Sequence, residues 1–368
     1  MSDVANSSVS GQLRKPVMIM AGGTGGHIFP GLAVAGELRQ RNVDVLWLGS
    51  SHGMENSLVP EHGYAIENIT IAGLRGRGIK ALLATPFSLL RAVVQAQKLL
   101  RRYKPRCVLS MGGFAAGPGG LAAWLLRRPV VVHEQNSVPG LTNRVLARLA
   151  KRVLTGFPGA FDDSAIDAGN PVRQEIAAVP APAERWAQRI GALRLLVLGG
   201  SQGATALNAT VPQALSLLPA ELPINVVHQC GNNNEKQTRN AYANVAVEAQ
   251  VKPFVTDMAE AYAWADLVVC RSGALTIAEL AAAGVGAVLV PFPHAVDDHQ
   301  TANAQYLVRC GAAQLCPEVE LTPEGLAAQL TTLLSDRDGL ENMAIKARAA
   351  ARPGAAVTVA DACLAVAQ

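Results

Sequence analysis

Short, continuously apolar runs alternate with helical stretches along the whole chain, and this alternation constrains the fold more than any other feature. Runs of this kind are typical of parallel strands that are covered on both faces. Strands that alternate with helices indicate βαβ units. We therefore predict an α/β fold with strands over 17–20, 45–48, 107–110, 130–133, 153–155, 195–198, 224–228, 267–270, 287–290 and 313–316, and with helices that include 31–41, 86–103, 276–283 and 323–334.

The two halves of the chain repeat one pattern, in which an apolar strand runs into a glycine turn and then a helix. The first turn is Gly22-Gly23-Thr24-Gly25-Gly26-His27, and the second is Gly199-Gly200-Ser201-Gln202-Gly203. Residues 169–193 between the halves contain three prolines, which suits a linker. We expect two doubly wound Rossmann-like domains whose parallel sheets face each other across a cleft, because ligands bind at the carboxyl ends of such strands.

Composition excludes several classes of protein. Apolar residues make up 50% of the chain and charged residues 16%, which argues against a disordered protein. The six cysteines are scattered without a Cys-x-x-Cys pair, so we interpret them as buried thiols in a reducing compartment. The first 15 residues lack the apolar core of a signal peptide. The uncharged run 107–126 reaches the length of a membrane span, but its five glycines and Pro118 favour a strand, a glycine loop and a helix.

Glycine-rich loops follow three of the expected strands, the third being Gly112-Gly113-Phe114-Ala115-Ala116-Gly117. Glycines let backbone N–H groups approach an anion, and the helix start that follows adds a partial positive charge. One such loop could equally be a tight turn, but three at strand ends favour the binding of phosphate. The sequence has no Gly-Lys-Ser/Thr motif, and Ile28 stands where a dinucleotide fingerprint needs glycine or alanine. A P-loop enzyme and a dehydrogenase are therefore disfavoured.

The segment 270–279 also follows an expected strand and opens a helix, and two interpretations of Glu279 stay open. Thr276 and Glu279 have the spacing of a capping box, and Ser272 is a second candidate cap. Alternatively, the Glu279 carboxylate accepts two hydroxyls of a ribose, which requires it to face the cleft.

Three polar clusters contain residues that could do chemistry. His27 lies at a positive helix start that favours neutral imidazole, so it is either a general base or a packing histidine. His133-Glu134-Gln135-Asn136 follows a strand, and we favour a polar pocket over a set of cross-links between loops. The loop 291–300 carries two histidines and two aspartates without a second ligand cluster, so we expect a hydrogen-bonding loop and no metal site.

The net charge of +4 is unevenly distributed. No acidic residue lies between Glu67 and Glu134, a stretch that holds eleven basic residues interleaved with aliphatic ones. An apolar face rimmed by Arg and Lys suits an anionic membrane surface, and the alternative is a core helix with a solvated basic edge. Nucleic acid is not expected, because the stretch is poor in rings for stacking. The predicted membrane patch consists of Arg75, Arg77, Ile79, Lys80, Leu82, Leu83 and Phe87.

These motifs, in this order from about Val17 to the carboxyl end, closely resemble those of the MurG family, the bacterial peptidoglycan N-acetylglucosaminyltransferases with the GT-B fold. The resemblance implies transfer of N-acetylglucosamine from UDP-GlcNAc to the undecaprenyl-diphosphate-linked muramyl pentapeptide called lipid I, which gives lipid II. It also implies peripheral attachment to the cytoplasmic face of the inner membrane, a role in peptidoglycan synthesis, cell shape and cell division, and no cofactor. Other cell-wall synthesis proteins are further candidate partners.

The resemblance assigns roles by motif. His27 is the candidate base that takes a proton from the muramyl 4-hydroxyl, and Glu134 is a more distant alternative. Val255 would contact uracil through its backbone, Glu279 the ribose and Gln300 the sugar. The positions implied for UDP-GlcNAc are Thr24, Gly25, Gly26, Asn136, Arg173, Ser201, Val255, Ala274, Leu275, Thr276, Ile277, Ala278, Glu279 and Gln300.

The resemblance also implies how the chain is divided. A carboxyl-terminal helix near 355–367 would cross back onto the first domain. An acceptor-binding, membrane-associated domain would then comprise 15–170 plus 350–368, and a UDP-GlcNAc-binding domain would comprise 171–349.

An α-linked donor and a β-linked product imply inversion by a single displacement, which needs one base and no nucleophile on the enzyme. N–H groups at helix starts would stabilise the departing UDP without a metal. Two rival functions stay open. An enzyme like UDP-GlcNAc 2-epimerase would leave the basic, aliphatic patch unexplained, and a non-catalytic membrane adaptor would not need the nucleotide site at 271–279.

Overall fold

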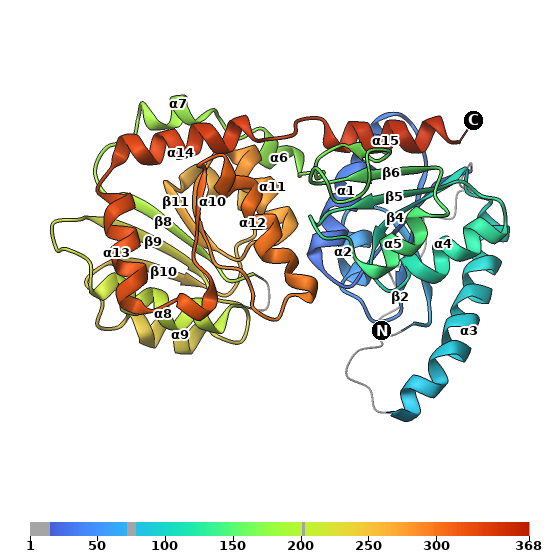
Figure 1. Ribbon diagram of the computed structural model, residues 1–368, viewed down its shortest axis with the longest axis horizontal. Coiled ribbons are helices and arrows are strands. Elements are labelled where there is room, and N and C mark those ends of the chain that lie inside the picture. The colour runs from blue at the N-terminus through green and yellow to red at the C-terminus, as the bar shows by residue number, and fades with distance from the viewer. Residues whose placement is uncertain (1–14, 72–78, 201–202, 368) are drawn as a thin grey trace, which may run out of the picture. The chain divides into compact units, whose positions relative to one another are not determined.

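The computed structural model describes residues 15–71, 79–200 and 203–367, and its contacts divide the chain into two compact units (Figure 1). Unit 1 runs to Pro171 and is rejoined by the chain at Gly354, and unit 2 spans Val172–Pro353. The boundaries expected from the sequence lie after residues 170 and 349.

Unit 1 is built on a parallel sheet. Within the described residues its strands follow the order β3-β2-β1-β4-β5-β6-β7, and every neighbouring pair is parallel. The order reverses between β1 and β4, so the connections after these two strands leave toward opposite faces of the sheet. The strands are β1 (Val17–Ala21), β2 (Val45–Ser50), β3 (Ala65–Ile69), β4 (Cys107–Gly112), β5 (Val130–Glu134), β6 (Arg152–Thr155) and β7 (Ile166–Asp167).

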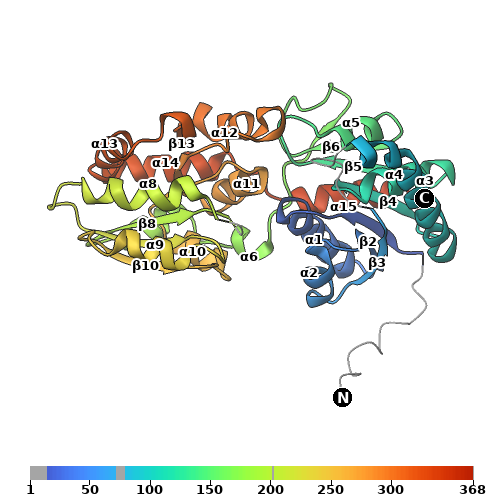
Figure 2. The ribbon, with the colours of Figure 1, turned by 90° about the horizontal axis from the view of Figure 1, so that it is seen from below.

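Helices cover both faces of this sheet. Side chains alternate along β1, so that Val17 and Ile19 pack with α1, α2 and α15, whereas Met18 and Met20 pack with α3, α4 and α5 (Figure 2). The carboxyl-terminal helix α15 packs along α1 and is held there by an ion pair of 2.6 Å between Arg41 and Asp361. The helices are α1 (Gly25–Gln40), α2 (Glu55–Glu61), α3 (Ile79–Tyr103), α4 (Ala116–Leu125), α5 (Leu141–Ala147) and α15 (Ala355–Ala365).

Unit 2 repeats the same topology with the strand order β10-β9-β8-β11-β12-β13, again parallel throughout the described part. Its reversal lies between β8 and β11. The strands are β8 (Leu193–Leu198), β9 (Ile224–Gln229), β10 (Glu248–Lys252), β11 (Leu267–Cys270), β12 (Gly286–Leu289) and β13 (Ala313–Leu315). The helices are α6 (Gln174–Ala177), α7 (Pro182–Trp186), α8 (Thr205–Ser216), α9 (Glu235–Tyr242), α10 (Met258–Trp264), α11 (Ala274–Ala283), η1 (Val296–Asp298), α12 (His299–Arg309), η2 (Glu318–Glu320), α13 (Pro323–Leu334) and α14 (Arg337–Ala349).

Each strand predicted from an apolar run is confirmed, but β3, β7 and β10 were missed. All three are edge strands of their sheets, where the burial is lower and the sequence is more polar. Two helix starts were also wrong: α1 begins at Gly25 instead of 31, and α3 begins at Ile79 instead of 86, with Pro86 inside the helix. Glycine and proline disfavour helix interiors, so the pattern placed both starts too late.

The structure tests the expectations for the uncharged run 107–126 and for the cysteines. The run 107–126 forms β4, a glycine loop and α4, and none of the helices in the described part combines the length and hydropathy needed to span a bilayer. Four cysteines are buried thiols as expected, but Cys310 is exposed and Cys316 is half-buried.

A buried histidine in unit 2 makes stability depend on pH. The His228 ring lies 2.9 Å from the Tyr242 hydroxyl and 3.0 Å from the Asn208 Oδ1 atom. Burial lowers the pKa of His228 to about 4. The unfolded histidine titrates near pH 6.5, so the unfolded state binds more protons between these values, and stability falls as the pH falls through this range.

We predict that this histidine costs about 3 kcal/mol of unfolding free energy on acidification from about pH 6.5 to about pH 4. Urea unfolding across this range should show a weaker pH dependence for His228→Gln than for the wild type. His294→Gln, at an exposed position of the same unit, is the matched control and should keep the wild-type dependence. Parallel curves for His228→Gln and the wild type would contradict the assignment.

Candidate functional site

The loops after β1 and β4 meet at the point where the strand order of unit 1 reverses. His27 lies in the first turn of α1, directly after the β1 loop. A Cβ atom on Gly112 would lie 2.9 Å from His27 Cε1, and a Cβ atom on Gly113 would lie 2.4 Å from the Gly22 carbonyl oxygen. Both glycines have positive φ angles, 102° and 91°. Their contacts show that these two glycines allow the β4 loop to pack closely on the β1 loop and on the His27 ring.

His27 is hydrogen-bonded to a side chain from the loop after β5. Its Nδ1 atom lies 2.9 Å from Gln135 Oε1, and Gln135 is 1% exposed. The Gln135 amide nitrogen lies 3.0 Å from both the Nδ1 atom and the carbonyl oxygen of His133. His133 is fully buried, its Nε2 atom is 2.9 Å from the Gly169 carbonyl oxygen, and burial lowers its pKa to about 4. The pocket interpretation therefore fails for His133 and Gln135, which link loops.

Glu134 is buried among donors from its own loop and from α5. Its Oε1 atom accepts from the Asn136 backbone N–H at 2.9 Å and from the Asn136 amide at 3.2 Å. Its Oε2 atom accepts from the Gly140 N–H at 3.1 Å and from Asn143 Nδ2 at 3.0 Å. Because both oxygens are occupied and the residue is 1% exposed, these contacts favour His27 over Glu134 as the base.

Glu55 is a fully buried carboxylate under the first glycine loop and was not predicted from the sequence. It accepts hydrogen bonds from the Ser50 N–H at 2.9 Å, the Ser50 hydroxyl at 2.7 Å and the Gly23 N–H at 3.1 Å. The Gly23 N–H group of the β1 loop therefore binds a carboxylate of the protein itself. In the sequence Glu55 looks like an ordinary acidic residue at the start of a helix, so no pattern pointed to it.

In unit 2, α11 begins directly after the β11 loop, at the second reversal of strand order. Gly273 is its N-cap and no side chain caps it, so the capping interpretation of Glu279 is wrong. The first-turn N–H groups of Ala274, Leu275 and Thr276 have no acceptor within the helix, which makes this helix start suitable for an anion. Leu275, Ile277 and Ala278 lie on the same first two turns.

Glu279 lies on α11 and is 4% exposed. Its Oε1 atom accepts from Arg173 Nη2 at 2.8 Å, and its Oε2 atom accepts from the Tyr262 hydroxyl at 3.1 Å. Burial raises the pKa of Glu279, and Arg173 opposes that rise. The two predicted residues Arg173 and Glu279 are therefore brought together, and Tyr262 on α10 is a neighbour that the sequence analysis missed.

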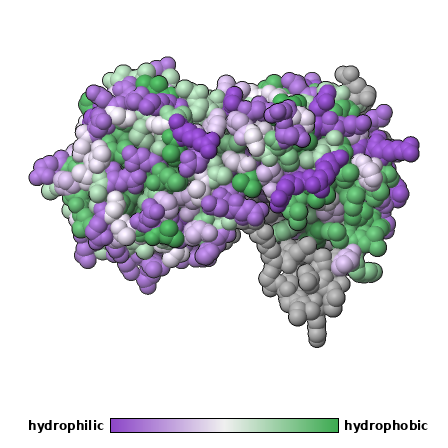
Figure 3. All heavy atoms as spheres, in the orientation of Figure 1, coloured by the Kyte–Doolittle hydropathy of each residue, from purple (hydrophilic) through white to green (hydrophobic). Residues whose placement is uncertain are grey.

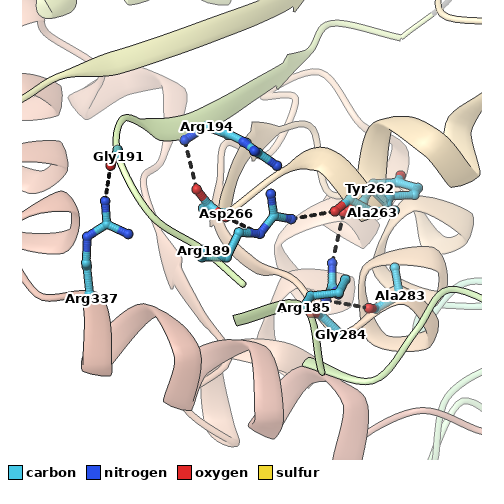
Figure 4. Close-up of polar contacts among 10 residues, drawn as sticks. All are labelled: Arg185, Arg189, Gly191, Arg194, Tyr262, Ala263, Asp266, Ala283, Gly284 and Arg337. Carbon is cyan, nitrogen blue, oxygen red and sulfur yellow. Dashed lines mark hydrogen bonds and ion pairs between the residues drawn. The ribbon is translucent and has the colours of Figure 1, made fainter. Parts of the chain in front are cut away.

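Arg185 on α7 and Arg189 just after it donate to carbonyl oxygens near the carboxyl ends of α10 and α11 (Figure 4). Arg185 donates to the carbonyl oxygen of Tyr262 at 3.1 Å, to that of Ala283 at 2.9 Å and to that of Gly284. Burial lowers the pKa of Arg185 to about 10. Cations at helix carboxyl ends stabilise the terminal carbonyl groups. This clamp fixes the two helices that carry Tyr262 and Glu279.

Val255 and Gln300, two further positions predicted to contact UDP-GlcNAc, already make hydrogen bonds within the protein. Val255 borders a pocket of about 310 Å³ with Phe254 and Trp264, but its N–H group already donates to Gln229 Oε1 at 3.3 Å. A uracil that used this N–H group would have to displace Gln229. The Gln300 Oε1 atom accepts from the Phe292 N–H at 2.9 Å.

The other predicted sites are described only in part. Thr24, Gly25 and Gly26 form the junction of the β1 loop with α1, and Ser201 lies outside the described residues. No group of three or more His, Cys, Asp and Glu residues that could hold a metal ion occurs within 15–71, 79–200 and 203–367.

The predicted membrane patch falls largely outside the described part: Arg75 and Arg77 are not described, and neither are the side chains of Ile79, Lys80, Leu82 and Leu83. Further along α3, Phe87 is 75% and Leu90 is 61% exposed. The neighbouring α4 ends in the exposed pair Trp124 and Leu125. Hydrophobic atoms gather on the face of unit 1 that carries α3 (Figure 3), and α3 also presents exposed basic residues such as Arg91 and Lys98.

The structure has two doubly wound α/β units, each with a helix start and polar side chains at its reversal of strand order, and the family models identify the chain as a two-domain glycosyltransferase. The glycosyltransferase family 28 N-terminal domain matches residues 17–155, and the corresponding C-terminal domain matches 194–359. The chain belongs to the MurG family within this class. The crystal structure of Acinetobacter baumannii MurG superposes with a TM-score of 0.84 at 45% identity and covers 96% of this chain and 100% of that one.

Curated relatives give the same family. A protein of Xylella fastidiosa strain M12 is 57% identical, with 94% of this chain and 95% of the relative covered. A protein of Alkalilimnicola ehrlichii is 55% identical, with 95% and 98% covered. Both are called UDP-N-acetylglucosamine--N-acetylmuramyl-(pentapeptide) pyrophosphoryl-undecaprenol N-acetylglucosamine transferase. The UDP-GlcNAc 2-epimerase of Neisseria meningitidis superposes with a TM-score of 0.66 at 14% identity, which shows a shared fold alone.

We predict that Glu55→Gln destabilises unit 1 by about 2 kcal/mol, because the new amide would turn an NH₂ group toward buried donors. The unfolding free energy in urea measures this loss. Glu61→Gln, at the exposed end of the same helix, should leave stability close to that of the wild type. Equal stability of Glu55→Gln and Glu61→Gln would show that Glu55 does not hold the glycine loop.

Proposed function

We propose that this protein transfers N-acetylglucosamine from UDP-GlcNAc to the 4-hydroxyl of the muramyl sugar of lipid I, which forms lipid II and UDP in peptidoglycan synthesis. The observation that carries this proposal is the identity of 53–58% to transferases of this name over about 95% of the chain. The intact arrangement of His27 in unit 1 and of Arg173 and Glu279 in unit 2 supports it.

On this proposal, unit 2 binds the donor. The first-turn N–H groups of α11 would hold the pyrophosphate, since a helix start favours negative charge and its donors need acceptors. Glu279 would accept from the ribose hydroxyls, and Arg173 would stay beside it as a counter-charge near the phosphates. The uracil would occupy the pocket bordered by Val255, and Gln300 would contact the sugar. Ser201 and, from unit 1, Thr24, Gly25, Gly26 and Asn136 complete the proposed set.

The chemical step is a single displacement. The His27 imidazole takes the proton of the muramyl 4-hydroxyl while the hydroxyl oxygen bonds to the anomeric carbon. The bond from that carbon to the UDP oxygen breaks, and UDP leaves as an anion. N–H groups of α11 that are already oriented toward the phosphates stabilise the developing charge without reorganising. We propose that this replaces a metal ion, so the reaction proceeds in the presence of a chelator.

The acceptor's lipid places the reaction at a membrane, and we propose that unit 1 lies on the cytoplasmic face of the inner membrane. The exposed apolar side chains Phe87 and Leu90 on α3, with basic residues on the same helix, are the support for this. Apolar side chains enter the headgroup region and Arg or Lys attract anionic lipid. Other proteins of cell-wall synthesis are proposed partners at the same surface.

We predict that the purified protein transfers radiolabelled N-acetylglucosamine from UDP-GlcNAc to a lipid I analogue in the presence of EDTA. His27→Ala should lower kcat by about a hundredfold or more, the usual contribution of a general base. His52→Ala, at an exposed position of unit 1, is the control and should keep wild-type turnover.

Three outcomes would contradict parts of this proposal. Conversion of UDP-GlcNAc without an acceptor would favour an epimerase. Loss of turnover on chelation would contradict the metal-independent step, and wild-type turnover of His27→Ala would remove His27 from the mechanism.

We also predict that the double variant Phe87→Ser/Leu90→Ser binds vesicles of anionic phospholipid at least about tenfold more weakly, because two apolar side chains no longer enter the bilayer. Flotation of protein with vesicles measures the bound fraction. Leu217→Ser removes a 52% exposed leucine from unit 2 and is the matched control. Unchanged flotation of the double variant would exclude α3 from the membrane contact.

A further inference from the structure

We propose that Gln135 is a positioning residue that fixes the tautomer of His27, so that Nδ1 carries the proton and Nε2 is the basic atom. The inference rests on the proposed function, in which His27 is the base, and adds to it the atom that takes the proton. A free imidazole can carry its proton on either nitrogen. A chain of hydrogen bonds in unit 1 removes this freedom. Which atom donates and which accepts in each bond follows from the group at the buried end of this chain.

The chain starts at the Gly169 carbonyl oxygen, which can only accept a hydrogen bond. The His133 Nε2 atom, 2.9 Å away, must therefore carry a proton. His133 is fully buried and neutral at physiological pH, because burial lowers its pKa to about 4. A neutral imidazole has one N–H group, so His133 Nδ1 carries a lone pair and accepts.

The orientation of the Gln135 amide follows from two acceptors. One terminal atom of Gln135 lies 3.0 Å from His133 Nδ1 and 3.0 Å from the His133 carbonyl oxygen. An amide oxygen there would face two lone pairs, so this atom is the nitrogen. The amide oxygen consequently faces His27 Nδ1 at 2.9 Å. Gln135 is 1% exposed, which leaves its side chain little room to turn. Its backbone carbonyl oxygen accepts from Asn170 Nδ2 at 3.0 Å, which holds the main chain at this position.

His27, which is half-buried, is the other end of the chain of hydrogen bonds. Because Gln135 Oε1 only accepts, His27 Nδ1 must donate, and the lone pair of the neutral ring lies on Nε2. Gly112 also packs closely beside the ring, because a Cβ atom there would lie 2.9 Å from His27 Cε1 and 3.1 Å from Nδ1. The ring is therefore fixed in both position and tautomer before any substrate binds, which is what a base in a preorganised site requires.

The proton balance of the step is then complete. The muramyl hydroxyl proton moves to His27 Nε2 as the hydroxyl oxygen bonds to the anomeric carbon and UDP leaves. The resulting imidazolium keeps its Nδ1–H bond to Gln135, whose amide dipole stabilises the new charge, and it later releases the Nε2 proton to water. A ring with the opposite tautomer would present an N–H group to the hydroxyl and could not take its proton.

The test is a nitrogen NMR spectrum of the full chain labelled with ¹⁵N-histidine, in which a protonated and a bare ring nitrogen have well-separated shifts. The His27 signals are assigned with His27→Gln. We expect His27 with Nδ1 protonated in the wild type and a mixture of tautomers in Gln135→Met, which has no acceptor. Gln213→Met, at an exposed position on α8, should leave the spectrum unchanged.

Kinetics provides the second measurement. Gln135→Met should lower kcat for transfer about tenfold while the KM for UDP-GlcNAc stays within about twofold, since the residue acts on the base and not on the donor. A merely structural role would leave the tautomer unchanged. His27 with Nε2 protonated in the wild type, or an unchanged tautomer in folded Gln135→Met, would overturn the inference. The spectrum needs no substrate, so it tests the tautomer independently of the proposed function. The proposed function is tested by transfer to the lipid I analogue and fails if that transfer is absent.

Discussion

The reversal of strand order in each parallel sheet is the constraint on which the rest of the structure depends. At a reversal, the connections after two adjacent strands turn to opposite faces, so a polar opening forms at the carboxyl edge of the sheet. In unit 1 this edge brings the loops after β1, β4 and β5 together around His27. In unit 2 the start of α11 lies directly after β11, the strand that pairs with β8 at the reversal. Two copies of one topology therefore carry different groups at this edge, a hydrogen-bonded histidine in unit 1 and an uncapped helix start in unit 2.

Buried carboxylates build these edges. Glu55 and Glu134 accept seven hydrogen bonds between them, mostly from backbone and side-chain donors of the surrounding loops. A buried carboxylate without such donors would raise the free energy of the folded state, and so would buried loop N–H groups without an acceptor. The carboxylates and the loops around them therefore stabilise each other. Glu279 follows the same rule with Arg173 and Tyr262.

The central strands were predictable because a strand covered on both faces must be apolar throughout, as β1 and β11 are. The outer strands β3, β7 and β10 were not, because a strand with lower burial can be polar and then resembles a loop. The early start of α1 was missed for a related reason. Gly25 and Gly26 are poor helix formers, and packing at the sheet edge outweighs their low propensity.

The class of fold was predictable from local pattern and from the apolar content of each strand, and so were the repeated strand–glycine–helix units and the residue types at their ends. Which of those residues touch became clear from the three-dimensional arrangement of the strands. His27 and Gln135 are 108 positions apart, and Arg173 and Glu279 are 106 apart. A hydrogen bond over such a distance depends on how strands are ordered in the sheet, and local pattern carries no information about that order. The structure therefore showed that Glu134 accepts hydrogen bonds from its own loop. It also showed that Glu55 lies under the β1 loop and that His27 bonds to Gln135.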